Sequence, residues 1–358
     1  MTIWTGVLFV AGIVLLIWGA DLLVRGAAHL AAAVGVPPLI IGLTVVAMGT
    51  SAPELAVSLQ AALSGQADLT LGNVVGSNIA NVLLILGLAA LVAPLIVASR
   101  LLQREVPAMI GISLLFWLLA ADGVISRLDG VVLIILLSAF MAVTIWSERR
   151  APAPPGSPSA RSDRTRWGLA RNLGLVLGGL ILLVAGAEWL VEGAVVFART
   201  LGVSELIIGL TIVAVGTSLP EIATSILASL RGERDIAVGN VVGSNILNLL
   251  AVLGLTALIS PQPITVPASA LAFDIPVMVA AAVACLPIFF NGRMIARWEG
   301  TLFVSYYVAY TAYLILAVAD SSTLPLFRTA MVFFVIPLTV VTVAVVTVRG
   351  LRESRQPA

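Results

Sequence analysis

Long apolar stretches recur from one end of this chain to the other, and they constrain its fold more than any other feature. Hydrophobic residues make up 60% of the 358 residues, and charged residues only 10%. Stretches of about 18 or more apolar residues are long enough to cross a bilayer as helices. A transmembrane β-barrel would instead alternate polar and apolar residues, which this chain does not do. The sequence therefore predicts an all-α polytopic membrane protein.

We expect ten spans and an eleventh at the C-terminal end. One polar break, Ser147 to Trp167, is rich in Pro, Ser and Arg, which is typical of a flexible linker. The expected division is a first repeat at 1–146, a cytoplasmic linker at 147–168, a second repeat at 169–320, and an extra span with a cytoplasmic tail at 321–358. The expected spans are 3–34, 37–63, 69–97, 105–121, 129–146, 170–198, 204–230, 236–259, 268–290, 299–319 and 325–348.

Composition also argues against several classes of function. No basic residue precedes the first apolar run, so we expect no signal peptide. The formal net charge of +1 offers no basic face for nucleic acid. The single cysteine, Cys285, allows no internal disulfide or CxxC motif, and the single histidine, His29, excludes a multi-histidine metal site. We expect neither enzyme catalysis nor a cofactor.

The two halves are repeats. When residue n is aligned with n+167, the block Gly42–Gly87 matches Gly209–Gly254 at 28 of 46 positions without a gap. Upstream, "GADLLVRGA" (19–27) faces "GAEWLVEGA" (186–194). Because each half holds five spans, the second half should enter the membrane upside down relative to the first. The sequence predicts two inverted-topology repeats.

The arginines agree with this inversion. By the positive-inside rule the arginine-rich linker is cytoplasmic, and counting outward from it places the N-terminus outside. The loop "SGQADL" then lies outside without arginine, whereas its repeat partner "RGERDI" lies inside with Arg231 and Arg234. The linker arginines are Arg149, Arg150, Arg161, Arg164 and Arg166; Arg100 and Arg104 also fall inside, and Arg127, Arg199 and Arg328 fall outside.

One phrase occurs once in each half: "VAMGTSAPELAVS" (46–58) and "VAVGTSLPEIATS" (213–225). A carboxylate in the middle of a membrane helix costs at least about 2.5 kcal/mol, so it indicates function. The proline has no N–H, and the glycine carbonyl four residues earlier therefore loses its helical partner. Such carbonyls persist only where protein or a polar cavity surrounds them. Each phrase places three polar side chains on one stripe of its helix: Thr50, Ser51 and Glu54 in the first half, and Thr217, Ser218 and Glu221 in the second.

A second motif follows, "GNVVGSNIAN" (72–81) and "GNVVGSNILN" (239–248). Its polar residues are four apart and share a face, as Asn73, Ser77 and Asn81 and as Asn240, Ser244 and Asn248. Pseudo-symmetry would gather both motifs at the membrane midplane. Carboxylate, carbonyl, hydroxyl and amide oxygens without nitrogen or sulfur ligands suit Ca²⁺ and Na⁺, and suit the rigidly hydrated Mg²⁺ less well.

Packing is the alternative for part of this pattern. Small polar stripes also hold membrane helices together, so packing and ion contact both stay open for Asn73, Asn78, Asn240 and Asn245. Two glutamates in matching proline contexts favour an ion role for Glu54 and Glu221. We expect no ion role for Asp21, Arg25, Glu188, Glu192, His29 or Cys285.

The motifs "GTSAPE" and "GTSLPE", each followed by "GNVVGSN", resemble the two α-repeats of the calcium/cation antiporter superfamily, in particular its sodium/calcium exchanger branch. The resemblance implies alternating access that exchanges Na⁺ for Ca²⁺. It implies Ca²⁺ between Glu54 and Glu221 with the backbone oxygens of Thr50 and Thr217. It further implies flanking Na⁺ sites at Ala47, Ser51 and Ser77 and at Ala214, Ser218 and Ser244, with Asn81 and Asn248 lining the middle.

The chain also departs from the family pattern. Several family members have an aspartate where this chain has Asn248, which leaves proton coupling and ion occupancy open. The eleventh span exceeds the usual ten. The short linker leaves no room for the calcium-sensing domain of animal exchangers, so we expect no such regulation.

Charge makes the expected mechanism concrete. One Ca²⁺ neutralises two ionised glutamates. Three Na⁺, as the family implies, would leave the site with a charge of about +1, so exchange should be electrogenic. The membrane potential then contributes about 2.3 kcal/mol per net charge moved per 100 mV. An empty site with two desolvated carboxylates is costly, so the empty carrier should not flip readily and low pH should inhibit. The expected moving parts are the long first spans, 3–34 and 170–198.

Other functions stay open at this point. An H⁺/Ca²⁺ exchanger would use the same glutamates, and a cation channel could also display rings of oxygen ligands. A channel, however, more often repeats around a pore in a symmetric oligomer, whereas this duplication lies within one chain. We expect a multi-pass protein of a prokaryotic plasma membrane, with the single chain as the transport unit and the lipid bilayer as its surroundings.

Overall fold

The computed structural model describes residues 3–65, 67–150, 166–201, 214–290, 292–319, 321–342 and 344. Within these ranges nine helices are long and apolar enough to cross a membrane, or ten if the bent pair Pro38–Thr50 and Ala52–Leu63 is one span. This confirms the predicted polytopic helical fold. Most of the expected linker (151–165), the start of the seventh expected span (202–213) and the C-terminal tail (345–358) lie outside the described residues.

The first half contains five spans, and its second span is broken in the middle. The bend between the two parts of that span is 41°. The elements in chain order are α1 (Ile3–Val34), α2 (Pro38–Ile41), η1 (Gly42–Val46), α3 (Ala47–Thr50), α4 (Ala52–Leu63), α5 (Ala67–Ala80), η2 (Asn81–Leu86), α6 (Gly87–Val92), β1 (Leu95–Ile96), η3 (Leu101–Glu105), α7 (Val106–Leu119), η4 (Ala120–Asp122), β2 (Val124–Ile125) and α8 (Arg127–Arg150).

In its described residues the second half repeats this order, apart from η4, and one further helix follows it. The π-helical segments of the third and eighth spans, η2 and η6, begin at Asn81 and Asn248, the asparagines that end the two GNVVGSN motif regions. The elements are α9 (Arg166–Thr200), α11 (Ala214–Gly216), α12 (Leu219–Leu230), α13 (Arg234–Leu247), η6 (Asn248–Leu253), α14 (Gly254–Ile259), β3 (Ile264–Thr265), η7 (Ala270–Asp274), α15 (Ile275–Phe290), β4 (Met294–Ile295), α16 (Arg297–Val318), α17 (Leu324–Ala330) and η8 (Met331–Val335).

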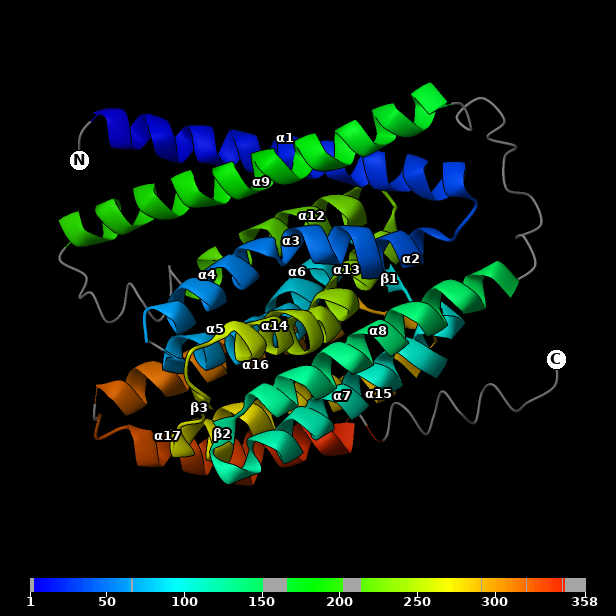
Figure 1. Ribbon diagram of the computed structural model, residues 1–358. Helices are drawn as coiled ribbons and strands as arrows, with labels where there is room; N and C mark the ends of the chain where they lie inside the picture. The colour runs from blue at the N-terminus through cyan, green and yellow to red at the C-terminus, as the bar shows by residue number, and fades with distance from the viewer. Residues whose placement is uncertain are drawn as a thin grey trace.

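The repeat-related helices α1 and α9 lie side by side along one edge of the bundle, with α17 at the opposite edge (Figure 1). Their contact depends on glycine. A Cβ at Gly12 would lie 2.8 Å from the carbonyl oxygen of Gly186, and a Cβ at Gly19 would lie 2.8 Å from that of Gly179. Small residues permit this close approach of membrane helices. Because Gly12 and Gly19 meet the second half in reverse order, α1 and α9 are antiparallel, as inverted repeats require.

Two short strand pairs tie the halves together in the same crossed manner. Strand β1 pairs with β4 and strand β2 with β3, both antiparallel. The first pair joins the loop after the third span to the loop after the ninth, and the second joins the loops after the fourth and eighth. Each pair would lie on one side of the membrane in the predicted inverted topology.

The extra span follows the second half as Leu324–Thr342, a stretch of 19 residues. It contacts α16 through polar groups: Tyr306 Oη donates to Thr339 Oγ1 at 2.8 Å, and Arg328 donates to Tyr313 Oη at 2.8 Å. Its apolar side chains, such as Leu326 and Phe333, are largely exposed. The predicted eleventh helix therefore forms at the periphery, where lipid would cover these side chains.

Candidate cation site

The two broken helices place a glutamate in the first turn after each break. Ser51 and Ser218 leave helical geometry, with ψ of 6° each, and α4 and α12 then begin with proline in their first turn. Ser51 N–H still donates to the carbonyl of Ala47, but Pro53 offers no N–H to the carbonyl of Gly49. The break thus exposes backbone oxygen beside Glu54.

The glutamates are held across the repeat boundary. Ser51 Oγ donates to Glu221 Oε1 at 3.3 Å, and Ser218 Oγ donates to Glu54 Oε1 at 3.3 Å. All four side chains are buried. Each carboxylate therefore depends on the serine of the other half, which brings both broken helices to one centre.

A second reciprocal set of bonds involves the asparagines of the GNVVGSN motifs. Thr50 Oγ1 donates to Asn240 Oδ1 at 3.1 Å, and Thr217 Oγ1 donates to Asn73 Oδ1 at 3.4 Å. Asn73 Nδ2 donates to the backbone oxygen of Glu54 at 3.0 Å. Asn73 and Asn240 therefore join helices through their side chains, as the packing interpretation expects.

Two serines complete this set, and sequence reasoning missed them. Asn73 Nδ2 donates to Ser58 Oγ at 2.9 Å, and Asn240 Nδ2 donates to Ser225 Oγ at 3.0 Å. Ser58 and Ser225 are the last residues of the duplicated phrase. Their conservation between the two phrases was the available signal.

The remaining oxygens of the cluster lack partners. Burying a polar group without a hydrogen bond costs about 1–3 kcal/mol, so such a group in a working protein calls for a bound water or ion. The following atoms are buried without a hydrogen-bond partner among the described residues: Glu54 Oε2, Glu221 Oε2, Ser77 Oγ, Ser244 Oγ, Asn81 Oδ1 and Asn248 Oδ1. A donor set of oxygens containing two carboxylates fits Ca²⁺ and Na⁺.

Two more asparagines lie at the edge of the cluster. Asn81 Nδ2 donates to Asn245 Oδ1 at 3.3 Å, and Asn245 Nδ2 contacts Met109 Sδ at 3.4 Å. Asn245 of α13 therefore orients Asn81, and Met109 of α7 in turn contacts Asn245, a contact for which the sequence offered no signal. Asn78 is buried with both side-chain atoms unpartnered in the described part of the chain.

The predicted site residues fall into one region of the bundle. Thr217 is half-buried, and Ala214 lies at the start of α11. The others are buried: Ala47, Thr50, Ser51, Glu54, Ser77, Asn81, Ser218, Glu221, Ser244 and Asn248. In the described ranges, no cluster of three or more His, Cys, Asp or Glu side chains could hold a metal ion. The two glutamates are thus the only pair of carboxylates that the described bonds bring to this centre.

Two inverted copies of a broken helix, each with a buried glutamate facing unsatisfied oxygens at the bundle centre, define a secondary transporter of cations. The sequence profile described as "Sodium/calcium exchanger protein" matches residues 4–146 and 171–316. The chain therefore belongs to the sodium/calcium exchanger protein family, within the calcium/cation antiporter superfamily.

Relatives from bacteria and archaea cover most of the chain. It is 42% identical over 314 residues to the "Putative antiporter CaxA" of Alkalimonas amylolytica, across 84% of this chain and 95% of that protein. It is 44% identical over 263 residues to the "Inner membrane protein YrbG" of Escherichia coli K12, across 72% and 80%. It is 34% identical over 334 residues to the "Sodium/calcium exchanger MaX1" of Methanosarcina acetivorans, across 84% and 95%.

A solved structure has the same fold. The sodium-calcium exchanger NCX_Mj matches with a TM-score of 0.76 at 32% identity, over 87% of this chain and 99% of that chain. Family and fold establish a multi-pass membrane protein whose activity is cation/Ca²⁺ antiport and not enzyme catalysis.

Proposed function

We propose that this antiporter exchanges Na⁺ for Ca²⁺ at the cluster between the broken helices. Ca²⁺ binds between Glu54 and Glu221, with the backbone oxygens of Thr50 and Thr217. Na⁺ occupies flanking positions formed by Ala47, Ser51 and Ser77, and by Ala214, Ser218 and Ser244, while Asn81 and Asn248 line the middle. The observation that supports this most is the reciprocal serine–glutamate bonding, which leaves the second oxygen of each carboxylate without a partner.

Charge balance supports antiport with net charge movement. One Ca²⁺ neutralises the two carboxylates, and three Na⁺ in its place leave the site with a charge of about +1. Each cycle therefore moves one net charge, and the membrane potential contributes about 2.3 kcal/mol per 100 mV to it. Without any cation, two buried carboxylates face one another at a centre with few donors, which opposes flipping of the empty carrier. Exchange is therefore favoured over leak.

Alternating access is supported by an unequal covering of the two glutamate-bearing helices. In the described part of the chain α1 packs along α12, whereas neither α1 nor α9 packs along α4. At repeat-related positions, Val57 on α4 is 41% exposed and Thr224 on α12 is buried. With the N-terminus outside, α4 leads outward, so the less covered of the two helices is the one on the outer side, while Glu54 and Glu221 are themselves buried. Movement of α1 and α9 would open the site to one side at a time.

We further propose the cytoplasmic membrane of a prokaryote as its location, the linker on the cytoplasmic side, and one chain as the transport unit. The predicted division at 1–146, 147–168, 169–320 and 321–358 stays a prediction; the family match to residues 4–146 and 171–316 supports it.

The test is ⁴⁵Ca²⁺ uptake into proteoliposomes driven separately by a Na⁺ gradient and by a pH gradient. We expect uptake only with the Na⁺ gradient, loss of uptake in the double variant Glu54→Gln/Glu221→Gln, and no change in Glu188→Gln, whose side chain is exposed on α9. Equal uptake with the pH gradient alone would refute Na⁺ coupling. Uptake that persists in the double variant would refute the site.

A further inference from the structure

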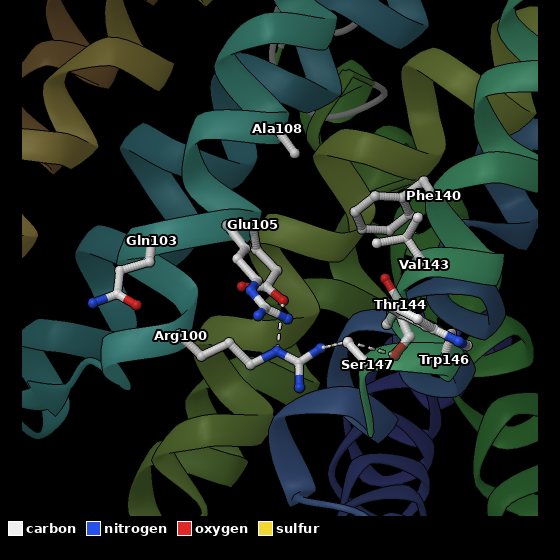
Figure 2. Close-up of a pocket in the computed structure, with 10 residues that line it drawn as sticks. Arg100, Gln103, Glu105, Ala108, Phe140, Val143, Thr144, Trp146 and Ser147 are labelled. Atoms are coloured by element: carbon white, nitrogen blue, oxygen red, sulfur yellow. Dashed lines mark hydrogen bonds and ion pairs between the residues drawn. The ribbon is translucent and has the colours of Figure 1, made fainter. Parts of the chain in front are cut away.

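A cavity of about 750 Å³ lies away from the cation site, between the start of the fourth span and the end of the fifth. Elements η3 and α7 form one wall and the last turns of α8 the other, as Figure 2 shows. Both walls are at helix ends, so the cavity is at the boundary between apolar and polar surroundings. In the predicted topology this boundary faces the cytoplasm, where the arginine-rich linker begins.

The polar end of the cavity holds a fixed arginine. Arg100 Nε donates to Glu105 Oε1 at 2.9 Å, and Arg100 Nη2 donates to Ser147 Oγ at 2.8 Å (Figure 2). Arg104 also lines the cavity and is exposed. Among the described lining residues, two arginines and one glutamate give a formal charge of +1. A preorganised guanidinium with a second arginine beside it favours a phosphate oxygen.

The carboxylate of Glu105 requires a hydrogen-bond donor from the ligand. Its side chain is 3% exposed, and Glu105 Oε2 has no hydrogen-bond partner among the described residues. A ligand that carries both a phosphodiester and a hydroxyl would satisfy the arginines and this oxygen together. The glycerol headgroup of phosphatidylglycerol has both groups and a net charge of −1.

The opposite end of the cavity is apolar and opens toward lipid. Ala108, Phe140 and Val143 line it, and Val143 is 60% exposed. Trp146, 55% exposed, lies at the rim, where tryptophan marks membrane interfaces. Neighbouring residues of α7 and α8, such as Leu118 and Ile135, are also exposed. An acyl chain can run along this wall while the headgroup stays at the arginines.

We propose that this cavity binds an anionic glycerophospholipid of the phosphatidylglycerol type, with its phosphate at Arg100 and Arg104 and its acyl chain along Phe140 and Val143. Basic pockets between membrane helices on the cytoplasmic side are suited to anionic headgroups. The claim does not depend on which ion is exchanged at the cation site.

The test is native mass spectrometry of the delipidated full chain offered equal amounts of phosphatidylglycerol, phosphatidylethanolamine and phosphatidylcholine. We expect the wild type to retain phosphatidylglycerol in preference to the other two. Arg104→Gln should weaken this retention about fivefold, because one arginine near the charged headgroup is lost. The exposed Arg297→Gln, at the same expected side of the membrane but outside the cavity, should retain the lipid like the wild type.

A second variant keeps the charges and fills the cavity. Val143→Trp changes a lipid-exposed position, so the protein should fold with an unchanged melting temperature and lose phosphatidylglycerol. Equal retention of all three lipids, or retention unaffected by both Arg104→Gln and Val143→Trp, would overturn the proposal. Displacement of the lipid by millimolar inorganic phosphate alone would show a free-anion site instead and would also overturn it.

Discussion

The two glutamate-bearing helices, α4 and α12, share a phrase but not an environment. Helix α12 is covered by α1, and Asp21 of α1 forms an ion pair with Arg231 at the end of α12. Arg231 aligns with Ser64 in the first half, which cannot make such a pair with Glu188, the counterpart of Asp21. The two halves thus carry the same proposed ion ligands but cover them unequally, and Arg231 lies in a loop outside the duplicated phrase.

This difference shows how two copies of one motif can take part in a transport cycle whose two sides are not equivalent. In the proposed cycle the same ions bind from either side, so equivalent ligands are needed, and the phrase occurs in both halves. The loops lie on opposite sides of the membrane, where the positive-inside rule places arginine on one side only. In the proposed cycle, an ion pair on one side would bias which side of the site is closed at rest.

The largest effect should come from the glutamates, and it should be equal in both halves. Glu54→Gln and Glu221→Gln each remove a buried charge whose partners are then left unmatched, at about 3 kcal/mol or more, so Na⁺-driven Ca²⁺ uptake should fall at least about 100-fold in each. Uptake rates at saturating Ca²⁺ in proteoliposomes measure this. If one variant keeps wild-type uptake, the two halves do not share the site.

The serines test the crossed bonding. Ser51→Ala removes a donor to Glu221, and Ser218→Ala removes a donor to Glu54. A hydrogen bond to a charged group contributes about 1.5 kcal/mol at the low end, so apparent cation affinity should fall about tenfold in both. The control is Ser138→Ala, whose exposed hydroxyl bonds only to its own helix at Ile134. Unequal losses would show that one half contributes more than the other.

Removing the asymmetric ion pair should have a smaller effect. Arg231→Ser makes the second half resemble the first. Because the ion pair is partly exposed, it contributes well under 1 kcal/mol to the conformation in which the cytoplasmic side is closed. The population of that conformation should therefore fall about twofold. Maleimide labelling of Val57→Cys from outside, in a Cys285→Ser background, should slow accordingly. Arg234→Ser, in the same loop, is the matched control. Faster labelling in Arg231→Ser would reverse the assigned role of the pair.

The smallest effect should come from the extra span, which only the second half has. A chain that ends after Ala319 removes a peripheral helix with exposed apolar side chains, so uptake should change less than about twofold. Uptake per purified chain measures this. A monodisperse truncated protein without uptake would instead make the eleventh helix part of the transport unit.

The sequence predicted the parts of this structure that follow from duplication. The broken helices, the inverted halves, the eleventh span and the burial of both glutamates come from apolar length, proline chemistry and the repeat. It did not predict Ser58 and Ser225 as partners of Asn73 and Asn240, because those bonds depend on how two helices face each other. Nor could it find the Asp21–Arg231 pair, since its residues are far apart in the chain and their repeat equivalents do not pair.

The central claim is that Ca²⁺ and Na⁺ compete for one site between Glu54 and Glu221. Equilibrium ⁴⁵Ca²⁺ binding to the purified protein tests it most directly. We expect one Ca²⁺ per chain, displaced by Na⁺ but not by equal concentrations of choline, and no binding in Glu54→Gln or Glu221→Gln. Binding that persists in both variants, or that Na⁺ does not displace, would contradict the claim.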